Sequence, residues 1–431
     1  MEPHIVIVGA GQAGLQAGET LRTAGYDGRL SVLGDEAHLP YHRPPLSKSW
    51  LAGEMSAQQL AMRAEAALAR KNIVIRTSTL VVELDTARRM LRLADGAQLH
   101  YTGLLLATGA TPRRLPCVQE CEEAIHVLRT RDDAGAVSEG LKRCAAHGLP
   151  VVVVGGGFIG LEVAATARKL GLAVTVLESA PRLLSRVLAP VLSDWYAALH
   201  RAHGVELVLD AARRRAPRTG LVLDARVAGV RPCGGHAVQV SLQGGQSYRA
   251  GLVLAGIGVR PNDALAEAAG IACEHGIVVD ACGRTSAPDV YAAGDCTARR
   301  LEDGSLLRLE SVQNAIEQGR AAAAGLLGRA TPFTAVPWFW SDQYDRKLQI
   351  AGLSQGAQAW AVRGDMHSGG AFSVYHFRQG RLVAVDSINA AKEHLAARAV
   401  LALPVQPTQE QVGSPGFDLP AFARAAQSAA G

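Results

Sequence analysis

Two stretches of the chain repeat one another and decide its fold: "IVIVGAGQAGLQAGETLRTAGYDGRLSVLGDE" at 5–36 and "VVVVGGGFIGLEVAATARKLGLAVTVLES" at 151–179. Each opens with a continuous, mostly β-branched run, which is typical of a parallel strand buried on both faces. A helical pattern and a second strand pattern follow. A strand–turn–helix–strand unit that occurs twice predicts an α/β fold with two Rossmann-type dinucleotide-binding domains.

Each unit carries the pattern G-x-G-x-x-G directly after its first strand. The first glycine permits a tight turn, the second lets a pyrophosphate approach the backbone, and the third lets the helix pack closely on the strand. The helix N-terminus then faces the phosphates. The six glycines are Gly9, Gly11, Gly14, Gly155, Gly157 and Gly160.

An acidic residue closes each unit, Asp35 in the first and Glu178 in the second. A carboxylate here accepts hydrogen bonds from an adenosine ribose. One such motif can arise from chance glycine spacing, but two copies in the same context, each with its acid, indicate two bound dinucleotides. A flavin enzyme that is reduced by a nicotinamide cofactor is the simplest protein that needs both.

A further segment fits a flavin site. The stretch "TSAPDVYAAGDC" (285–296) ends a strand pattern in Gly294–Asp295, where a carboxylate could bind the ribityl hydroxyls of a flavin. For this segment taken alone, an aspartate with a structural role in the turn is an equally good interpretation.

Composition excludes several other classes of protein. The 431 residues are 48% hydrophobic and 19% charged, as in a folded chain of two or three domains. The net charge of +5 comes without a run of five basic residues, so neither nucleic acid nor a membrane is expected as a partner. The seven cysteines include no C-x-x-C pair; the closest pair is Cys117 and Cys121. We therefore expect free thiols in a cytoplasmic protein, with no metal or iron–sulfur site.

Seven segments, in this order, resemble the NADH-dependent ferredoxin reductases of bacterial oxygenase systems. They are "PYHRPPLSK", "ATGATPR", "GGGFIGLEVAA", "GIGVRPN", "DVYAAGDC", "ESVQNAIEQG" and "PWFWSDQ". The resemblance runs from about residue 4 to past residue 400. It implies a glutathione-reductase-like fold with a split FAD domain (1–112 and 245–328), an NAD domain (113–244) and a C-terminal α+β interface domain (329–431).

The same resemblance implies catalytic roles for Lys48 and Glu162. In such reductases the lysine of PPLSK lies near flavin N5, and the glutamate pairs with it and points toward the nicotinamide. An ammonium there would favour the anionic reduced flavin. Without the resemblance, "PPLSK" would be a stiff surface loop, and Glu162 an acid that gains from the dipole of its helix.

Further cofactor contacts are implied by position. For FAD, they involve the first three glycines with Ala13, Asp35, Lys48, Val81, Arg129, Asp295, Val312 and Trp338. For NAD, they involve the second three glycines with Glu178 and Gly258. Three of these residues have simpler interpretations: Arg129 could be a solvated charge beside a capping box of Thr130 and Asp133, Asp295 a turn residue, and Trp338 a core residue.

Charged residues and the cysteine pattern predict which nicotinamide is used and what accepts the electrons. Glu178 accepts the 2′-OH of NAD and repels a 2′-phosphate, so NADH is expected, although Arg182 could meet a phosphate. Because four closely spaced cysteines are absent, we expect a separate acidic [2Fe–2S] ferredoxin. Scattered basic residues could meet it, with Arg308 the best placed: Arg63, Arg299, Arg300, Arg308, Arg346 and Lys347.

Other functions stay open to different degrees. A disulfide reductase of this fold needs a cysteine pair, and an NADH oxidase or peroxidase needs a cysteine near residue 42, where His42 and Arg43 stand. A rubredoxin reductase and a flavoprotein NADH sensor resembling apoptosis-inducing factor remain as alternatives. Phe158 departs from the pattern, because a tyrosine is more usual there.

Overall fold

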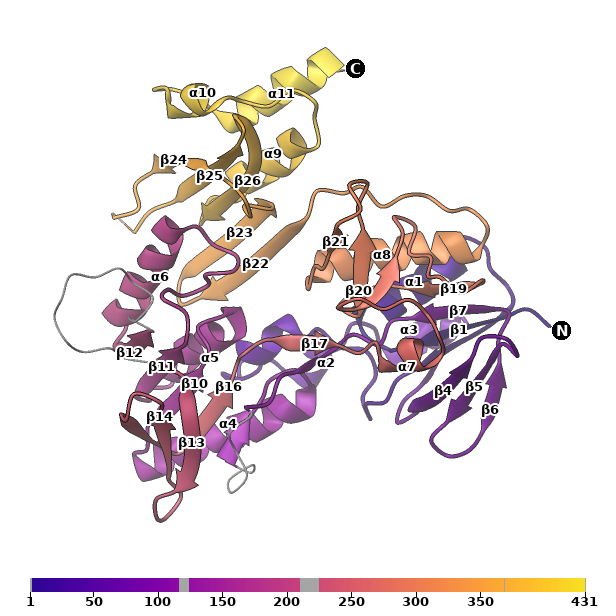
Figure 1. The fold of residues 1–431 in the computed structure, drawn as a ribbon, viewed down its shortest axis with the longest axis horizontal. Coiled ribbons are helices and arrows are strands. Elements are labelled where there is room, and N and C mark those ends of the chain that lie inside the picture. The colour runs from indigo at the N-terminus through magenta and orange to yellow at the C-terminus, as the bar shows by residue number, and fades with distance from the viewer. Residues whose placement is uncertain (1, 116–123, 210–224, 368, 431) are drawn as a thin grey trace. The chain divides into compact units, whose positions relative to one another are not determined.

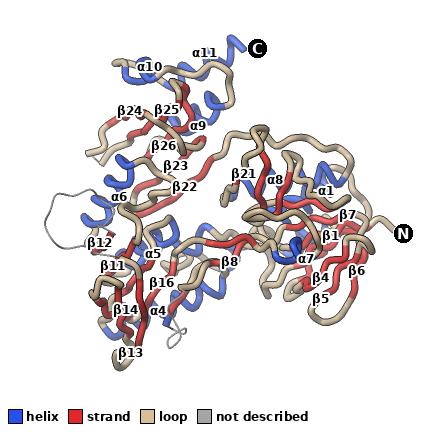
Figure 2. Tube along the Cα trace, in the orientation of Figure 1, coloured by secondary structure: helices blue, strands red, loops and turns tan. Residues whose placement is uncertain are grey.

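The computed structural model describes residues 2–115, 124–209, 225–367 and 369–430 (Figures 1 and 2). The chain forms two compact units. The first unit comprises Met1–His42, Ser56–Thr111 and Val259–Ala335, and the second comprises Arg43–Met55, Pro112–Gly258 and Val336–Gly431. The predicted Cys117–Cys121 spacing lies outside the described residues. None of the helices in the described segments is long and apolar enough to cross a membrane.

The first unit is built on a parallel sheet in the order β19-β7-β1-β2-β3. Its strands are β1 (His4–Val8), β2 (Arg29–Leu33), β3 (Val74–Arg76), β7 (Gly103–Leu106) and β19 (Val290–Ala292). All five residues of β1 are buried, as the apolar run predicts. Ile5 and Ile7 pack in one core cluster, and Val6 and Val8 pack in another. This alternation follows from the two-residue period of a strand.

Two helices cover the Ile5–Ile7 face: α1 (Gln12–Thr23) and α8 (Val312–Leu326). They approach closely, because a Cβ atom on Gly319 would lie 2.7 Å from the Ala13 carbonyl oxygen. The opposite face packs on an antiparallel sheet of β4 (Val81–Asp85), β5 (Met90–Leu93) and β6 (Gln98–His100) (Figure 1). Smaller elements complete the unit: α2 (Ala57–Leu60), α3 (Glu65–Arg70), α7 (Ala264–Ala268), β18 (Ile277–Val279), β20 (Thr297–Arg300) and β21 (Leu306–Leu307).

The second unit repeats this plan with a parallel sheet in the order β12-β11-β10-β16-β9. Its strands are β9 (Ile125–His126), β10 (Val151–Val154), β11 (Val174–Glu178), β12 (Val205–Leu209) and β16 (Leu252–Ala255). Its helices are α4 (Arg131–His147), α5 (Phe158–Lys169) and α6 (Pro190–Ala202). An antiparallel sheet of β13 (Val227–Pro232), β14 (Val238–Leu242) and β15 (Ser247–Ala250) packs on it. The repeat that the sequence predicts is therefore present in three dimensions.

The C-terminal part of the second unit is α+β, with an antiparallel sheet in the order β22-β23-β26-β25-β24. The strands are β22 (Trp338–Gln343), β23 (Arg346–Gly352), β24 (Ala359–Gly364), β25 (Phe372–Arg378) and β26 (Arg381–Ile388). Three helices share a core with this sheet: α9 (Ala391–Leu401), α10 (Gln409–Gly413) and α11 (Leu419–Ala430).

The two units divide the chain differently from the predicted domains: residues 336–431 share a unit with the predicted NAD domain, and residues 329–335 belong to the first unit. Residues 43–55, which include the 3-10 helix η1 (Pro44–Ser47), belong to the second unit. Strand β16 pairs with β10, so the chain up to Gly258 belongs there as well. The short strands β8 (Ala110–Pro112) and β17 (Val259–Pro261) pair with each other. The assignment of an FAD, an NAD and an interface domain stays a prediction.

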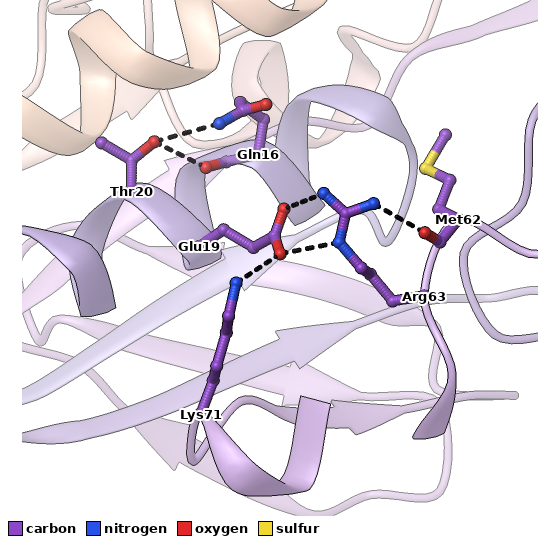
Figure 3. Close-up of polar contacts among 6 residues, drawn as sticks. All are labelled: Gln16, Glu19, Thr20, Met62, Arg63 and Lys71. Carbon is purple, nitrogen blue, oxygen red and sulfur yellow. Dashed lines mark hydrogen bonds and ion pairs between the residues drawn. The ribbon is translucent and has the colours of Figure 1, made fainter. Parts of the chain in front are cut away.

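A buried carboxylate ties the α2–α3 segment to α1 (Figure 3). Glu19, 7% exposed on α1, accepts hydrogen bonds from the Arg63 Nε at 2.9 Å and from the Lys71 Nζ at 2.8 Å. The second Glu19 oxygen accepts from Arg63 Nη2 at 2.9 Å. Arg63 was one of the basic residues expected to be available to a ferredoxin; the structure shows instead that its guanidinium serves the fold.

Candidate functional site

The first glycine motif forms a cradle at the N-terminus of α1. A Cβ atom on Gly9, whose φ is +113°, would lie 2.1 Å from the Ala107 carbonyl oxygen, and one on Gly14 would lie 1.9 Å from the Gly9 carbonyl oxygen. Only glycine fits either position. A Cβ on Gly11 would meet nothing within 4 Å. The middle glycine therefore leaves room where a pyrophosphate can approach the backbone, so these residues fit a dinucleotide.

The second glycine motif has the same geometry at the N-terminus of α5. A Cβ atom on Gly155 would lie 2.4 Å from the Gly256 carbonyl oxygen, and one on Gly160 would lie 2.2 Å from the Gly155 carbonyl oxygen. At Gly157 the nearest atom to a Cβ would be 3.9 Å away. The two cradles agree position by position, which supports two dinucleotides of similar chemistry.

The end of strand β19 and the start of α8 form the predicted flavin end of the first unit. The Gly294 backbone N–H donates to the Gln318 side-chain oxygen at 2.7 Å, and the Thr297 hydroxyl donates to the same oxygen at 2.9 Å. Ser311 caps α8, and Val312 is the first helical residue, as the sequence predicts. Asp295 follows directly on this fixed turn. Its ribityl-binding role stays a prediction, with the helix dipole of α8 favouring nearby negative charge.

The two predicted ribose acids differ in their surroundings. Asp35 lies exposed just after β2. Glu178, at the end of β11, already accepts from the Gly156 N–H at 2.7 Å and from the Ala180 N–H at 2.6 Å. Glu178 is thus fixed against its glycine turn, and its carboxylate keeps lone pairs for a ribose hydroxyl.

Arg182 is occupied by the fold. Its guanidinium donates to the Leu188 carbonyl at 2.6 Å, to the Ser193 hydroxyl at 2.8 Å and to the Ser185 carbonyl at 3.1 Å. With all these bonds in place, Arg182 is a poor candidate for binding a 2′-phosphate. The arrangement favours NADH, as the acid at Glu178 predicts.

Lys48 and Glu162, which the sequence predicts as a pair, are in contact in the second unit. Lys48 Nζ lies 2.6 Å from Glu162 Oε2, and the Glu162 side chain is only 3% exposed. The same oxygen accepts from the Ser47 hydroxyl at 2.5 Å. Glu162 Oε1 accepts from the Ser341 hydroxyl at 2.6 Å. A buried charge needs a counter-ion and hydrogen bonds, and Glu162 has both.

The "PPLSK" turn is held by one face of α5. Thr166 lies four residues after Glu162 and donates its hydroxyl to the Ser47 carbonyl at 2.8 Å. Residues four apart share a helix face. Two prolines begin η1, and Lys48 ends it with its N–H bonded to the Pro45 carbonyl at 3.0 Å. The stiff loop is therefore docked on the helix that follows the second glycine motif, and the interpretation as a bland surface loop is wrong.

The remaining predicted residues lie where their elements place them. Arg129 directly precedes the capping box of Thr130 and Asp133, which is formed as the alternative interpretation expected. The Arg129 carbonyl accepts a hydrogen bond from Arg43 Nη1 at 2.8 Å. Val81 begins β4 and is buried. Gly258, with φ +98°, lies at the end of the loop after β16. Their cofactor contacts stay predictions.

Trp338 belongs to an aromatic cluster of the second unit. The Arg398 guanidinium carbon lies 4.7 Å from its ring centroid, and the rings of Trp340 and His394 lie at 5.6 and 5.9 Å. Phe158 packs on Phe339 with ring centroids 4.7 Å apart. Phe158 therefore makes a contact between two apolar rings at the position where the resemblance led us to expect a tyrosine.

The basic residues that could meet an acidic partner differ in how far their charge is already taken up by other groups of the protein. Arg308 is 22% exposed and bonds Glu310 at 2.8 Å, so its charge is balanced within its own loop. Arg299 donates to the Phe333 carbonyl at 2.7 Å. Arg300 and Lys347 are exposed, and neither forms an ion pair within the described segments. These two are the better candidates, each within its own unit.

Family comparisons agree with this geometry. Residues 3–319 match the family model described as pyridine nucleotide-disulphide oxidoreductase, and residues 338–423 match a reductase C-terminal model. The chain belongs to this family. The predicted α/β, glutathione-reductase-like fold class is confirmed, and so is the resemblance to ferredoxin reductases of oxygenase systems.

Three relatives show how far the family likeness extends. Rhodocoxin reductase of Rhodococcus erythropolis is 40% identical over 96% of this chain and 93% of its own. Putidaredoxin reductase of Pseudomonas putida is 39% identical over 94% and 93%. The crystal structure of the covalent putidaredoxin reductase–putidaredoxin complex matches with a TM-score of 0.87 and 37% identity over 99% of both chains.

Three residues at the site escaped the sequence analysis: Ser47, Thr166 and Ser341. The signal for Thr166 was available, because it lies four residues after Glu162. Ser47 directly precedes the predicted lysine. Ser341 lies in the motif "PWFWSDQ", but nothing in the sequence connects it with Glu162, because the two residues are 179 positions apart and only folding brings them together.

Proposed function

We propose that the chain is an FAD-dependent NADH:ferredoxin oxidoreductase. It would take hydride from NADH and pass single electrons to an acidic [2Fe–2S] ferredoxin that serves a haem-thiolate monooxygenase or a Rieske oxygenase. The observation that carries this proposal is the Lys48–Glu162 pair at 2.6 Å, held on the helix that begins at the second dinucleotide cradle.

The residues divide the work as follows. FAD, when bound, supplies a centre that accepts two electrons together and releases them one at a time. The N-termini of α1 and α5 would hold the two pyrophosphates, and Asp35 and Glu178 the two adenosine riboses. The Lys48 ammonium would favour negative charge beside it, and Glu162 keeps that ammonium in one place.

The relatives supply the partner class. Rhodocoxin reductase and putidaredoxin reductase are named for small redox proteins, and the biphenyl dioxygenase system ferredoxin--NAD(+) reductase component of Paraburkholderia xenovorans, 37% identical over 96% of this chain, is named for a dioxygenase. A rubredoxin reductase is the second candidate, because the rubredoxin-NAD(+) reductase of Pseudomonas putida is 36% identical over 93% of this chain. The proposal includes a cytoplasmic location, which suits the five described cysteines, all free thiols.

The test measures NADH oxidation by the purified yellow holoenzyme with a panel of ferredoxins and a rubredoxin. We expect one non-covalent FAD per chain, fast turnover with at least one ferredoxin, and slower turnover with rubredoxin. Faster turnover with rubredoxin would favour the second candidate. Flavin reduction by NADH without transfer to any of these carriers would favour the sensor resembling apoptosis-inducing factor, and a colourless protein that cannot be reconstituted would refute all three.

A further inference from the structure

A chain of hydrogen-bonded polar side chains leads from Glu162 to the half-buried Tyr344. We call it the donor chain: Ser341, Gln343, His200 and Tyr344. Ser341 Oγ lies 2.6 Å from Glu162 Oε1, and Gln343 Nε2 lies 3.2 Å from Ser341 Oγ. His200 Nε2 lies 2.8 Å from Gln343 Oε1, and the Tyr344 hydroxyl lies 3.1 Å from His200 Nδ1.

The donor chain is unusual in its burial. Ser341 and His200 are completely buried, and Gln343 is 1% exposed. Ser341 and Gln343 lie two residues apart on β22 and so share a face of the sheet. Burying three polar side chains costs free energy unless each is hydrogen-bonded, and apolar residues would fill the same space without that requirement. None of the roles proposed so far uses these side chains.

The hydrogen bonds of the donor chain all run in one direction. Glu162 faces an ammonium and is therefore a carboxylate, which can only accept, so Ser341 must donate its single proton to it. Gln343 then donates its amide to Ser341 and accepts from His200 Nε2. Burial lowers the pKa of His200 to about 4, so the ring is neutral at pH 7, with its proton on Nε2 and Nδ1 accepting from Tyr344.

The two Glu162 oxygens therefore have separate duties. Oε2 pairs with the Lys48 ammonium and accepts a hydrogen bond from the Ser47 hydroxyl. Oε1 accepts a hydrogen bond from Ser341 alone among the described residues. Without Ser341, Oε1 would be a buried acceptor with no donor among the described residues, and the carboxylate would rotate to avoid this. Such a rotation would move the counter-charge of Lys48.

We propose that Ser341 is a positioning residue for hydride transfer, aimed by the donor chain at Glu162 and acting through it on Lys48. The inference rests on the proposed function, in which the Lys48–Glu162 pair serves flavin reduction. Aligned hydrogen bonds strengthen one another in a low-dielectric interior, so the orientation of Ser341 depends on the side chains behind it.

The test compares Ser341→Ala with Ser373→Ala in the holoenzyme. Ser373 is a matched control, because its hydroxyl is buried in the same sheet and bonds Ser387 at 2.9 Å without contacting Glu162. We expect Ser341→Ala to slow flavin bleaching by saturating NADH about tenfold in stopped-flow measurements, the loss of one hydrogen bond to a charged group. Ser373→Ala should keep the wild-type rate, Ser341→Thr should restore most of it, and Gln343→Leu should show a smaller loss.

A double-mutant cycle with Glu162→Gln separates positioning from packing. In the Glu162→Gln background, Ser341→Ala should cause no further slowing. The same cycle is read by urea denaturation, which does not depend on activity: Ser341→Ala should lower the midpoint in wild type and change it much less beside Glu162→Gln. A wild-type rate in Ser341→Ala or Gln343→Leu, or equal slowing in both backgrounds, would overturn the inference. Failure of wild-type flavin to be reduced by NADH would refute the proposed function instead.

Discussion

At the scale of single residues, Glu162 is the centre of the site. Its buried carboxylate is paired with the Lys48 ammonium and accepts hydrogen bonds from two hydroxyls. One hydroxyl belongs to Ser47, which precedes Lys48, and the other belongs to Ser341 on β22. In the first repeat the equivalent position, two residues after the third glycine, is Gln16. Its amide donates to Thr20 at 3.3 Å within the same helix (Figure 3). The same position thus carries a local helix contact in the first repeat and a buried charge with three partners in the second.

Replacing Lys48 tests the pair directly. Lys48→Met should retain FAD but slow flavin reduction by NADH about 100-fold, because the cation that favours negative charge is gone. It should also lower stability, since Glu162 keeps its serine donors but loses its counter-ion.

The control is the double variant Lys48→Met with Glu162→Gln. It should regain stability, because no uncompensated charge is buried, while flavin reduction stays slow. Stopped-flow absorbance and urea denaturation provide the two readouts. An unchanged rate of bleaching in Lys48→Met would remove Lys48 from the mechanism.

Glu178 sets the choice of nicotinamide. Glu178→Gln should narrow the ratio of kcat/KM for NADH over NADPH about tenfold, because repulsion of a 2′-phosphate is lost while a side-chain oxygen still reaches the backbone amides. Arg182→Ala should leave the ratio unchanged, since that guanidinium is bound to the fold. Equal use of both cofactors by the wild type would contradict the ribose assignment.

At the scale of elements, α1 and α5 show how one repeated helix takes on two tasks. Both begin at a glycine cradle, and both use a buried acid to hold a distant segment. In α1, Glu19 holds the α2–α3 segment through Arg63 and Lys71. In α5, Glu162 and Thr166 hold the turn that carries Lys48. Each helix packs on its sheet and, through side-chain hydrogen bonds, fixes the position of a segment that is distant along the chain.

The Glu19 cluster should contribute stability that depends on pH. Burial alone would raise the pKa of Glu19, but hydrogen bonds from Arg63 and Lys71 outweigh it, and the pKa is lowered. This stability is complete above the usual pKa of glutamate and is lost as pH falls through the lower folded value. Glu19→Gln should cost about 1–2 kcal/mol at pH 7, a modest value because both cations are half exposed and can be hydrated.

Urea denaturation at neutral and acidic pH checks this, with Glu139→Gln as the matched control. Glu139 forms an exposed pair with Lys142, and its replacement should change stability little. If the loss of unfolding free energy caused by Glu19→Gln stayed constant down to the lowest pH at which the protein folds, packing and not charge would hold the α2–α3 segment.

At the scale of the whole molecule, buried histidines make stability sensitive to acid. Burial lowers the pKa of His200 and of His394 to about 4, and it also lowers the pKa of His4 and of the partly buried His126. Between the folded values and the unfolded value of 6.5 the unfolded chain binds more protons. The free energy of unfolding therefore rises with pH across this window.

His394→Leu should flatten that slope. The two ring nitrogens of His394 are buried and have no hydrogen-bond partner among the described residues, so an apolar side chain of similar size removes a cost at every pH. The gain should grow from neutral pH toward pH 4 by up to about 3 kcal/mol. His367→Gln, at an exposed position, serves as the control. A parallel shift of the whole pH–stability curve in His394→Leu would show that His394 does not contribute to the slope.

The sequence by itself determined the repeat, the two glycine cradles and the pairing of Lys48 with Glu162. Glycine spacing is a local requirement at the third glycine of each motif, because a Cβ on Gly14 or Gly160 would meet the carbonyl oxygen of Gly9 or Gly155, five residues earlier. Apolar periodicity is local as well, and it placed β1, β10 and the helices after them. Lys48 and Glu162 came from family motifs that carry their own spacing.

Only the tertiary structure decided which polar groups complete the site and which charges are available. Ser341 reaches Glu162 from 179 residues away, and Arg63 is taken by Glu19 across 44 residues. Arg182, which the sequence offered to a phosphate, is instead taken by carbonyls of its own loop. Hydrogen bonds and ion pairs form between whichever groups folding brings within about 3 Å, and a linear pattern does not encode that proximity.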